Sequence, residues 1–178
     1  MKNTMKEAFV EWVIDLKPLI HMVVRFKSDY VDMPREQALW HLNWLLHCIN
    51  RRLFSRHYRQ NNAYIKGFVF REKPEGYIHF HLLLMLDAGM YFSFHDAVHM
   101  ALPRVHLPER PVQVLEEPTI KCIRHYSRDV VLYCLKDVRK HLNTLDLDDI
   151  AILDKEGVSG LVNNFETIWE NRRNYVFK

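Results

Sequence analysis

The spacing of hydrophobic positions in the first third of the chain predicts two helices and one strand. Residues 1–16 have the pattern of an amphipathic helix that leads to Pro18. Residues 19–26 are apolar and β-branched, which is typical of a strand. Pro34 and the polar residues after it suit the first turn of a helix, and apolar side chains then recur at helical spacing to about Phe54.

The middle of the sequence predicts a β-hairpin. Residues 63–71 and 77–87 are strand-like, and the turn-forming sequence Lys-Pro-Glu-Gly lies between them. A short helix is expected over 94–101, and a strand over 112–115 follows a loop that contains three prolines.

The last part of the chain predicts one long helix and little other regular structure. Residues 127–142 have a helical pattern, with Ser127 as a candidate N-cap. The acidic, glycine-containing stretch 146–160 is expected to be a loop, and residues 164–173 a short terminal helix.

From residue 19 to residue 142 the predicted elements follow the order β-α-β-β-α-β-α, which indicates an α+β fold. We expect a central antiparallel β-sheet with helices packed on one face, as in ferredoxin-like and RRM-like domains. The predicted domain covers residues 1–145, with its core at about 19–142. Residues 146–178 are expected to form a loop and a short helix that pack on this domain or trail it.

Composition excludes several classes of protein. With 178 residues, of which 48% are hydrophobic and 26% charged, the chain has the size and composition of one globular domain. Its 5 glycines form neither G-x-G-x-x-G nor G-x-x-x-x-G-K-[ST], so a glycine-built phosphate loop is excluded. The net charge of +3 is compatible with a nucleic-acid partner, and 11 histidines offer metal ligands.

The cysteines and the apolar runs bear on location. The 3 cysteines share no C-x-x-C spacing, which favours free thiols in a reducing compartment and a cytoplasmic protein. The apolar runs, such as 82–86, are far shorter than the roughly 20 residues that cross a bilayer. We therefore expect no membrane partner.

Strand alternation brings two of the histidines together. The even-numbered residues from 78 to 84 are all apolar, whereas His79 and His81 project from the opposite face of the same strand. Their Cα atoms are expected to lie roughly 6.5–7 Å apart, so both imidazoles can reach one metal ion.

A third ligand follows from the hairpin register. If the turn is centred between Pro74 and Glu75, Glu72 pairs with Tyr77 and lies diagonal to His79 on the same face. Two histidines and a glutamate suit Mn²⁺ or Mg²⁺, although Zn²⁺ or Co²⁺ could also bind. Glu75 is the alternative ligand, because a register error of one residue would move Glu72 to the other face.

A second motif lies on the last long helix. Tyr133 and Lys136 are three residues apart, so the phenol and the ammonium group project from one side. A tyrosine is a poor nucleophile near pH 7, but a metal-polarised phosphodiester lowers the demand on it. A lysine one turn away can offset negative charge in the transition state.

Both motifs resemble those of one enzyme family. His79-Phe80-His81 resembles the histidine-hydrophobic-histidine motif of the HUH endonucleases, and Tyr133-x-x-Lys136 resembles the nucleophile motif of their single-tyrosine, replication-initiator (Rep) branch. The upstream acid, the histidine pair and the tyrosine helix occur in the Rep order over about residues 19–140.

The resemblance implies a reaction and a role for each residue. His79, His81 and Glu72 would hold a divalent metal that orients a phosphate of single-stranded DNA, and Tyr133 would attack it with Lys136 as an accessory cation. The products would be a 5′-phosphotyrosyl link and a free 3′-hydroxyl, which starts rolling-circle replication of a plasmid, phage or mobile element. Because no helicase motif follows, a separate helicase is the expected partner.

A basic segment before the nucleophile helix has two interpretations. It is either a phosphate-binding segment, with stacking help from its tyrosine, or a solvated loop. Its residues are Arg124, His125, Tyr126 and Arg128.

Two rival functions remain open. One is a transposase of the same superfamily that uses the same site. The other is a non-catalytic, RRM-like nucleic-acid-binding domain, for which Phe68, Phe70 and Tyr77 would be base-stacking platforms on the histidine face.

Overall fold

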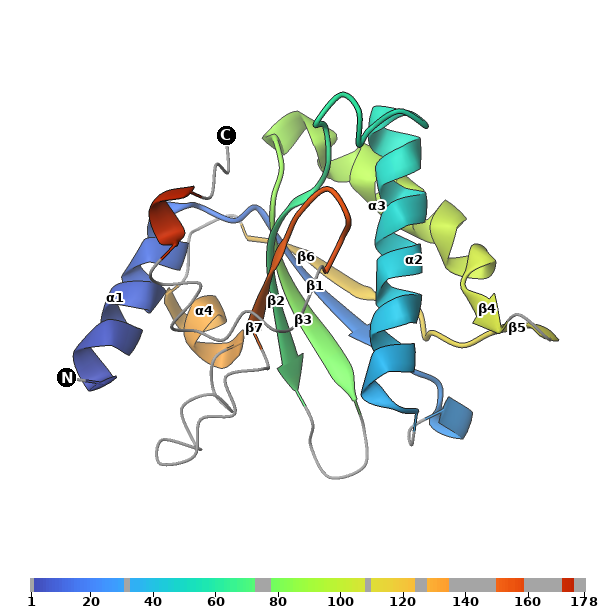
Figure 1. Ribbon diagram of the computed structural model, residues 1–178, viewed down its shortest axis with the longest axis horizontal. Coiled ribbons are helices and arrows are strands. Elements are labelled where there is room, and N and C mark those ends of the chain that lie inside the picture. Colours follow the sequence, from blue (N-terminus) through green and yellow to red (C-terminus); the bar gives the residue numbers. More distant parts are fainter. Residues whose placement is uncertain are drawn as a thin grey trace.

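A five-stranded antiparallel sheet lies at the centre of the molecule (Figure 1). The computed structural model describes residues 2–30, 33–72, 78–107, 110–123, 128–134, 150–158 and 171–174. The strand order is β6-β1-β3-β2-β7. The bounds are β1 Ile20–Arg25, β2 Lys66–Glu72, β3 His79–Met85, β6 Thr119–Cys122 and β7 Ile150–Leu153.

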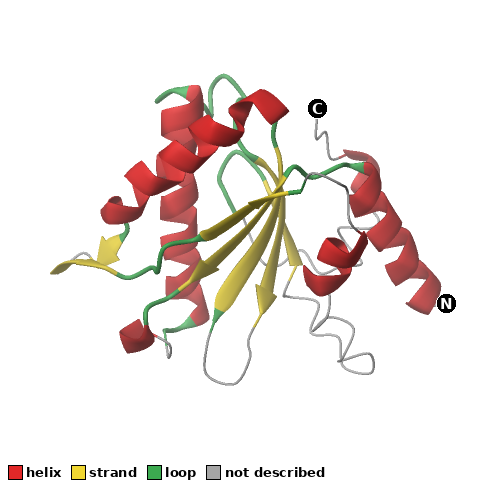
Figure 2. Ribbon diagram, turned by 180° about the vertical axis from the view of Figure 1, so that it is seen from behind, coloured by secondary structure: helices red, strands yellow, loops and turns green. Residues whose placement is uncertain are grey.

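Within the described residues, four α-helices pack on this sheet, and a short two-stranded ribbon lies beside it (Figure 2). The helices are α1 Lys2–Asp15, α2 Arg35–Phe54, α3 Tyr91–Ala101 and α4 Arg128–Cys134, and the ribbon strands are β4 His106–Leu107 and β5 Arg110–Gln113. Short 3₁₀ helices cover Ser28–Tyr30, Ala88–Met90, Leu102–Arg104 and Arg172–Asn174.

The chain connectivity confirms the α+β prediction. The sequence β1-α2-β2-β3-α3-β6 is a β-α-β-β-α-β arrangement, in which β3 lies between β1 and β2 and pairs antiparallel with both. Because β1 and β3 occupy inner positions of the sheet, residues on their faces are held between neighbouring strands.

One face of the sheet packs against α2 and α3, to the right in Figure 1. The apolar stripe of α2 faces it and is almost fully buried. Phe80, Leu82 and Leu84 of β3 contribute to the same core, as the alternation predicts. This face is the hydrophobic centre of the domain.

The prediction that helices cover only one face is wrong, because α1 and α4 pack on the other (Figure 1). They bring Phe9, Val10, Val13 and Val131 against Phe68, Phe70, Leu83, Ile150 and Ile152 of the sheet. Those sheet residues belong to β2, β3 and β7. Exposure of this apolar surface to water would be unfavourable, so α1 and α4 are needed to bury it.

The remaining half of that face is polar. It is formed by β6, β1 and the first part of β3, where the alternating positions carry His21, Arg25, Thr119, Lys121, His79 and His81, with Val23 among them. We call it the polar half-face. It lies on the side of α4, whose last described residue is Cys134.

Two short strands differ from the sequence prediction. Residues 150–153 form β7, so the prediction of a loop over 146–160 is wrong at this point. Strand β6 was not predicted at all. Both have only four residues, which is short for a strand pattern, and β7 is buried throughout, so it shows no alternation.

Residues 110–115 also differ from the predicted strand at 112–115. Strand β5 ends at Gln113 in the outer ribbon, and Val114 and Leu115 continue into the core on the side of α2. Of the predicted helices over 127–142 and 164–173, Ser127, 135–142 and 164–170 lie outside the described residues.

Candidate metal centre and nucleophile

Strand β3 presents two histidines at the polar half-face. Its side chains alternate as predicted, with Phe80 in the core on the α2 side and His79 and His81 on the opposite face. His81 is only 2% exposed, whereas the His79 side chain is 14% exposed. The site is therefore anchored in the sheet and open at the His79 end.

Glu72 is the third member of the cluster, but its register differs from the prediction. Glu72 pairs with His79 instead of Tyr77, which shifts the hairpin by two residues. The connection after β2 is longer than a turn centred between Pro74 and Glu75 would be. Because side chains alternate with a period of two, this error leaves Glu72 on the histidine face and brings it directly opposite His79. Glu75 lies outside the described residues.

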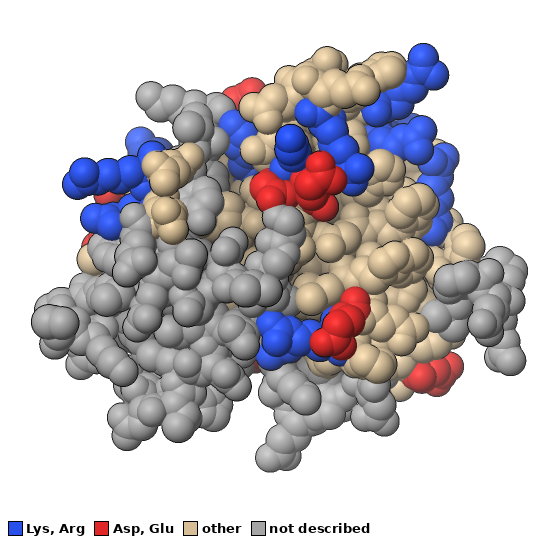
Figure 3. All heavy atoms as spheres, in the orientation of Figure 1, with Lys and Arg blue, Asp and Glu red and all other residues tan. Residues whose placement is uncertain are grey.

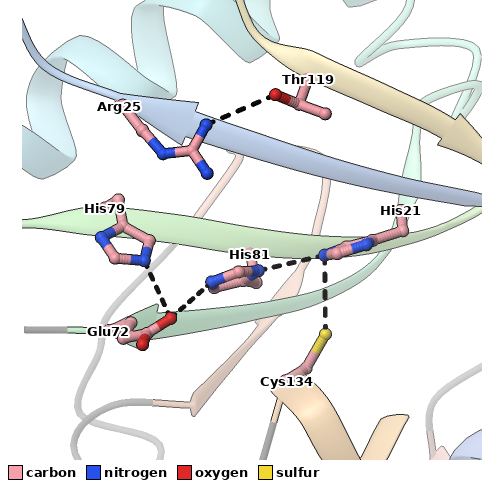
Figure 4. A network of polar contacts seen from close by, with 7 residues as sticks. All are labelled: His21, Arg25, Glu72, His79, His81, Thr119 and Cys134. Carbon is pink, nitrogen blue, oxygen red and sulfur yellow. Dashed lines mark hydrogen bonds and ion pairs between the residues drawn. The ribbon is translucent and has the colours of Figure 1, made fainter. Parts of the chain in front are cut away.

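The three side chains converge on one point (Figure 4). Glu72 Oε2 lies 2.8 Å from His79 Nε2 and 2.6 Å from His81 Nε2. Ligand atoms on adjacent vertices of an octahedral ion are about 3 Å apart at metal–oxygen distances of about 2.1 Å. These residues can therefore hold a divalent cation with only a small adjustment.

His21 of β1 extends this cluster on its buried side. Its Nε2 lies 3.0 Å from His81 Nδ1, and the two rings are stacked with an interplanar angle of 16°. Burial lowers the pKa of His21 to about 4, helped by His81 and by the nearby cations Lys121 and Arg25. His21 is therefore neutral at pH 7.

The hydrogen bonds of His81 depend on whether a cation is bound. A carboxylate only accepts hydrogen bonds, so without a cation His81 donates its Nε2–H to Glu72 and its Nδ1 accepts from His21. A cation on Nε2 requires the other tautomer, in which His81 Nδ1–H donates to the neutral His21. His21 can thus hold the ring of His81 in either state.

Tyr133 lies beside the histidine cluster. Its ring centroid is 5.4 Å from that of His81 and 6.4 Å from that of His21. The adjacent Cys134 is buried, with Sγ 3.7 Å from His21 Nε2, and it anchors this end of α4. Tyr133 itself is 49% exposed, so its phenol is close to the cluster and accessible from solvent.

The other predicted site residues are placed as follows. Arg128 begins α4 and forms an ion pair with Glu11 of α1. Both side chains are about half exposed, so the pair helps to set α4 against α1 but adds little stability. Lys136 and the segment Arg124, His125 and Tyr126 lie outside the described residues.

Sequence reasoning missed His21, Arg25 and Cys134. Alternation along 19–26 would have placed His21, Val23 and Arg25 on one face of a strand. Alternation alone does not show that this strand pairs with β3, or that the face with His21 and Arg25 is the face that carries the histidine pair. The position of Cys134 beside His21 becomes clear only from the way α4 packs on the sheet.

Comparisons with known proteins add nothing to this description. No protein-family model matches the chain, and no curated protein or solved structure matches it significantly. Among the described helices, none combines the length and the apolar character needed to cross a membrane. The candidate function therefore rests on the geometry of the site.

Proposed function

We propose that this protein is a metal-dependent, sequence-specific endonuclease and strand transferase for single-stranded DNA. The observation that carries the proposal is the position of Tyr133, whose exposed ring adjoins His81 of a convergent histidine-histidine-glutamate set. Nucleophile and candidate metal ligands come from sequence segments about 50 residues apart, and the fold brings them together.

The proposed chemistry is one transesterification. The Tyr133 hydroxyl loses its proton to solvent, and its oxygen attacks the scissile phosphorus, which stays bonded to the 5′ oxygen of the downstream DNA. The bond to the 3′ oxygen breaks, and that oxygen leaves as a 3′-hydroxyl after taking up a proton. Mn²⁺ or Mg²⁺, when bound, would neutralise charge on the phosphate oxygens. Attack by that 3′-hydroxyl reverses the reaction and reseals the strand.

The charges around the cluster support a phosphodiester substrate. Arg25 pairs with His79 across β1 and β3, and its Nη1 donates a hydrogen bond to Thr119 Oγ1 at 3.3 Å. Lys121 pairs with His21 across β1 and β6. Both are exposed on the polar half-face, where they can contact backbone phosphates next to the one that is cleaved.

The burial of two phenylalanines counts against the RRM-like alternative. Phe68 and Phe70 are 0% and 1% exposed, because α1 and β7 pack around them. They cannot stack on bases without the removal of that cover. Tyr77, the third aromatic residue of that hypothesis, lies outside the described residues.

The biological setting that fits this chemistry is the start of rolling-circle replication of a plasmid, phage or mobile element in the cytoplasm. A partner helicase would unwind the nicked duplex. A transposase would perform the same first step, and the two differ in whether the 3′-hydroxyl primes synthesis or is transferred to another DNA end.

The test is formation of a covalent adduct. The protein is incubated with a library of single-stranded oligonucleotides, including hairpins, in Mn²⁺, and the products are separated on a denaturing gel. We expect a shifted protein–DNA band that is lost on chelation and in Tyr133→Phe. Tyr91→Phe, on α3 at the opposite face of the sheet, is the matched control and should retain the band.

Two results would contradict the proposal. An adduct that persists in Tyr133→Phe but is lost in Tyr126→Phe would assign the nucleophile to the other tyrosine. DNA binding without an adduct, for any oligonucleotide and any divalent metal, would indicate a binding domain instead of an enzyme.

A further inference from the structure

We propose that His21, His81 and Cys134 form a second metal site, specific for a thiophilic cation such as Zn²⁺, and that it competes with the Glu72 site for His81. His21 Nε2 lies 3.0 Å from His81 Nδ1 and 3.7 Å from Cys134 Sγ. The donor atoms of the three residues all lie within 4.8 Å of one another. In Figure 4 both contacts of His21 meet at the same ring nitrogen.

These distances are close to those of a zinc site. Zinc–nitrogen bonds of about 2.0–2.1 Å and zinc–sulfur bonds of about 2.3 Å, at tetrahedral angles, separate two nitrogens by about 3.4 Å and nitrogen from sulfur by about 3.6 Å. The set needs only a small opening of the His21–His81 contact. Three protein ligands leave the fourth position to water.

The ligand chemistry distinguishes this set from the one at Glu72. A thiolate and two imidazoles favour Zn²⁺ or Co²⁺, whereas Mn²⁺ and Mg²⁺ prefer the carboxylate. The three residues are each at most 9% exposed, which limits the access of bulk water to the metal–thiolate bond. On binding, the Cys134 thiol loses its proton to solvent and its sulfur becomes the ligand.

His81 makes the two sites mutually exclusive. A neutral imidazole has one nitrogen with a free lone pair, and the other carries the proton. A cation bound to Nδ1 through the inner set keeps the proton on Nε2, where it donates to Glu72. A cation at Glu72 needs the lone pair on Nε2. Zn²⁺ at the inner set would therefore prevent binding of the catalytic metal. This exclusion rests on the proposed function, but the thiolate site itself does not.

Titration with Co²⁺ under a non-chelating reductant tests the site, because a cobalt–thiolate bond gives a charge-transfer band in the near ultraviolet. We expect a band that saturates at one equivalent in the wild type and disappears when Zn²⁺ is added. It should be retained in Glu72→Gln and lost in Cys134→Ser. Cys48→Ser and Cys122→Ser are matched controls and should retain it.

The absence of a band in the wild type, or its persistence in Cys134→Ser, would overturn the site. If circular dichroism shows that Cys134→Ser is unfolded, Cys134→Ala and His21→Gln take its place, with the same expected loss.

Excess Mn²⁺ tests the exclusion separately. It should suppress the cobalt–thiolate band in the wild type by taking His81 through Nε2, and it should leave the band unchanged in Glu72→Gln. Suppression in both proteins would show direct displacement by Mn²⁺, and no suppression in the wild type would show independent sites. Either result overturns the exclusion. None of these measurements depends on DNA cleavage, so failure of the proposed nuclease activity is recognised independently.

Discussion

At the scale of single residues, His81 is the side chain on which the site depends. One of its nitrogens faces a carboxylate and the other faces a neutral imidazole, and both contacts are buried. A buried ring with two fixed partners cannot rotate freely, so the directions of its two ring nitrogens are set before a ligand arrives. The sequence predicts that His81 shares a face with His79, but it does not predict the contact between His81 and His21.

Removal of the carboxylate should weaken metal binding. In Glu72→Gln we expect the affinity for Mn²⁺ to fall at least about tenfold, because a charged ligand becomes a neutral amide. Isothermal titration calorimetry measures this directly. Glu75→Gln, the alternative ligand of the sequence analysis, should bind Mn²⁺ like the wild type. An equal loss in both variants would show that Glu72 has no special role.

A second buried histidine gives a prediction about stability. His41 of α2 is 0% exposed, and neither of its ring nitrogens has a hydrogen-bond partner among the residues that the structure describes. An unsatisfied buried polar group costs about 1–3 kcal/mol. His41→Leu should therefore raise the free energy of unfolding at pH 7 by about 1–2 kcal/mol in urea denaturation, whereas the exposed His57→Leu should not.

The same residue should contribute to acid sensitivity. Burial lowers the pKa of His41 below the value of about 6.5 that it has in the unfolded chain. Below pH 6.5 the unfolded state then binds more protons than the folded state, so stability falls as the pH falls. Between pH 7 and pH 5, His41→Leu should lose less stability than the wild type. A parallel loss in both proteins would contradict this.

At the scale of elements, the β2–β3 hairpin shows what sequence patterns can and cannot give. Alternation predicted which side chains share a face, and that part is correct for His79, His81 and Glu72. The register was wrong by two residues, because it depends on the length of the connection, which a turn motif indicates only loosely. The predicted face is still correct, because side chains alternate with a period of two and a shift of two residues leaves each of them on the same face.

Gly67 tests the importance of this register. A Cβ at this position would collide with the backbone carbonyl oxygen of Leu83 on β3, which cannot move without loss of strand pairing. Gly67→Ala should therefore lower the free energy of unfolding by about 1–3 kcal/mol. Gly89→Ala, where a Cβ meets nothing within 4 Å, should change it by less than about 0.5 kcal/mol. Thermal melts of the two variants should differ accordingly.

At the scale of the whole molecule, the two faces of the sheet differ in composition. The α2 side is a continuous core, while the other side is divided into an apolar part under α1 and α4 and the polar half-face. Basic side chains also gather at the upper edge of the view in Figure 3, where α2 ends. Arg51, Arg52 and Arg104 line a small pocket between α2 and the end of α3. The molecule thus offers two basic surfaces.

The proposed DNA path predicts which basic surface matters. Arg25→Ala on the polar half-face should weaken binding of single-stranded DNA and reduce the slope of log affinity against log salt by about 0.7, the value for one phosphate contact. Arg51→Ala should have a smaller effect, because it lies on the α2 side. Fluorescence anisotropy at several salt concentrations measures both. A larger loss in Arg51→Ala would move the path to the other surface.

Strand β7 has a consequence for how the protein folds during synthesis. It pairs residues 150–153 with residues 67–70, so this contact closes a loop of about 80 residues. Until residue 153 has left the ribosome, the outer edge of β2 is unpaired and Ile150 and Ile152 do not yet cover Phe68 and Phe70. Contacts between such distant segments form slowly, and open strand edges promote association between chains. A nascent chain of this protein therefore passes through an interval in which a chaperone, or another strand, can occupy that edge.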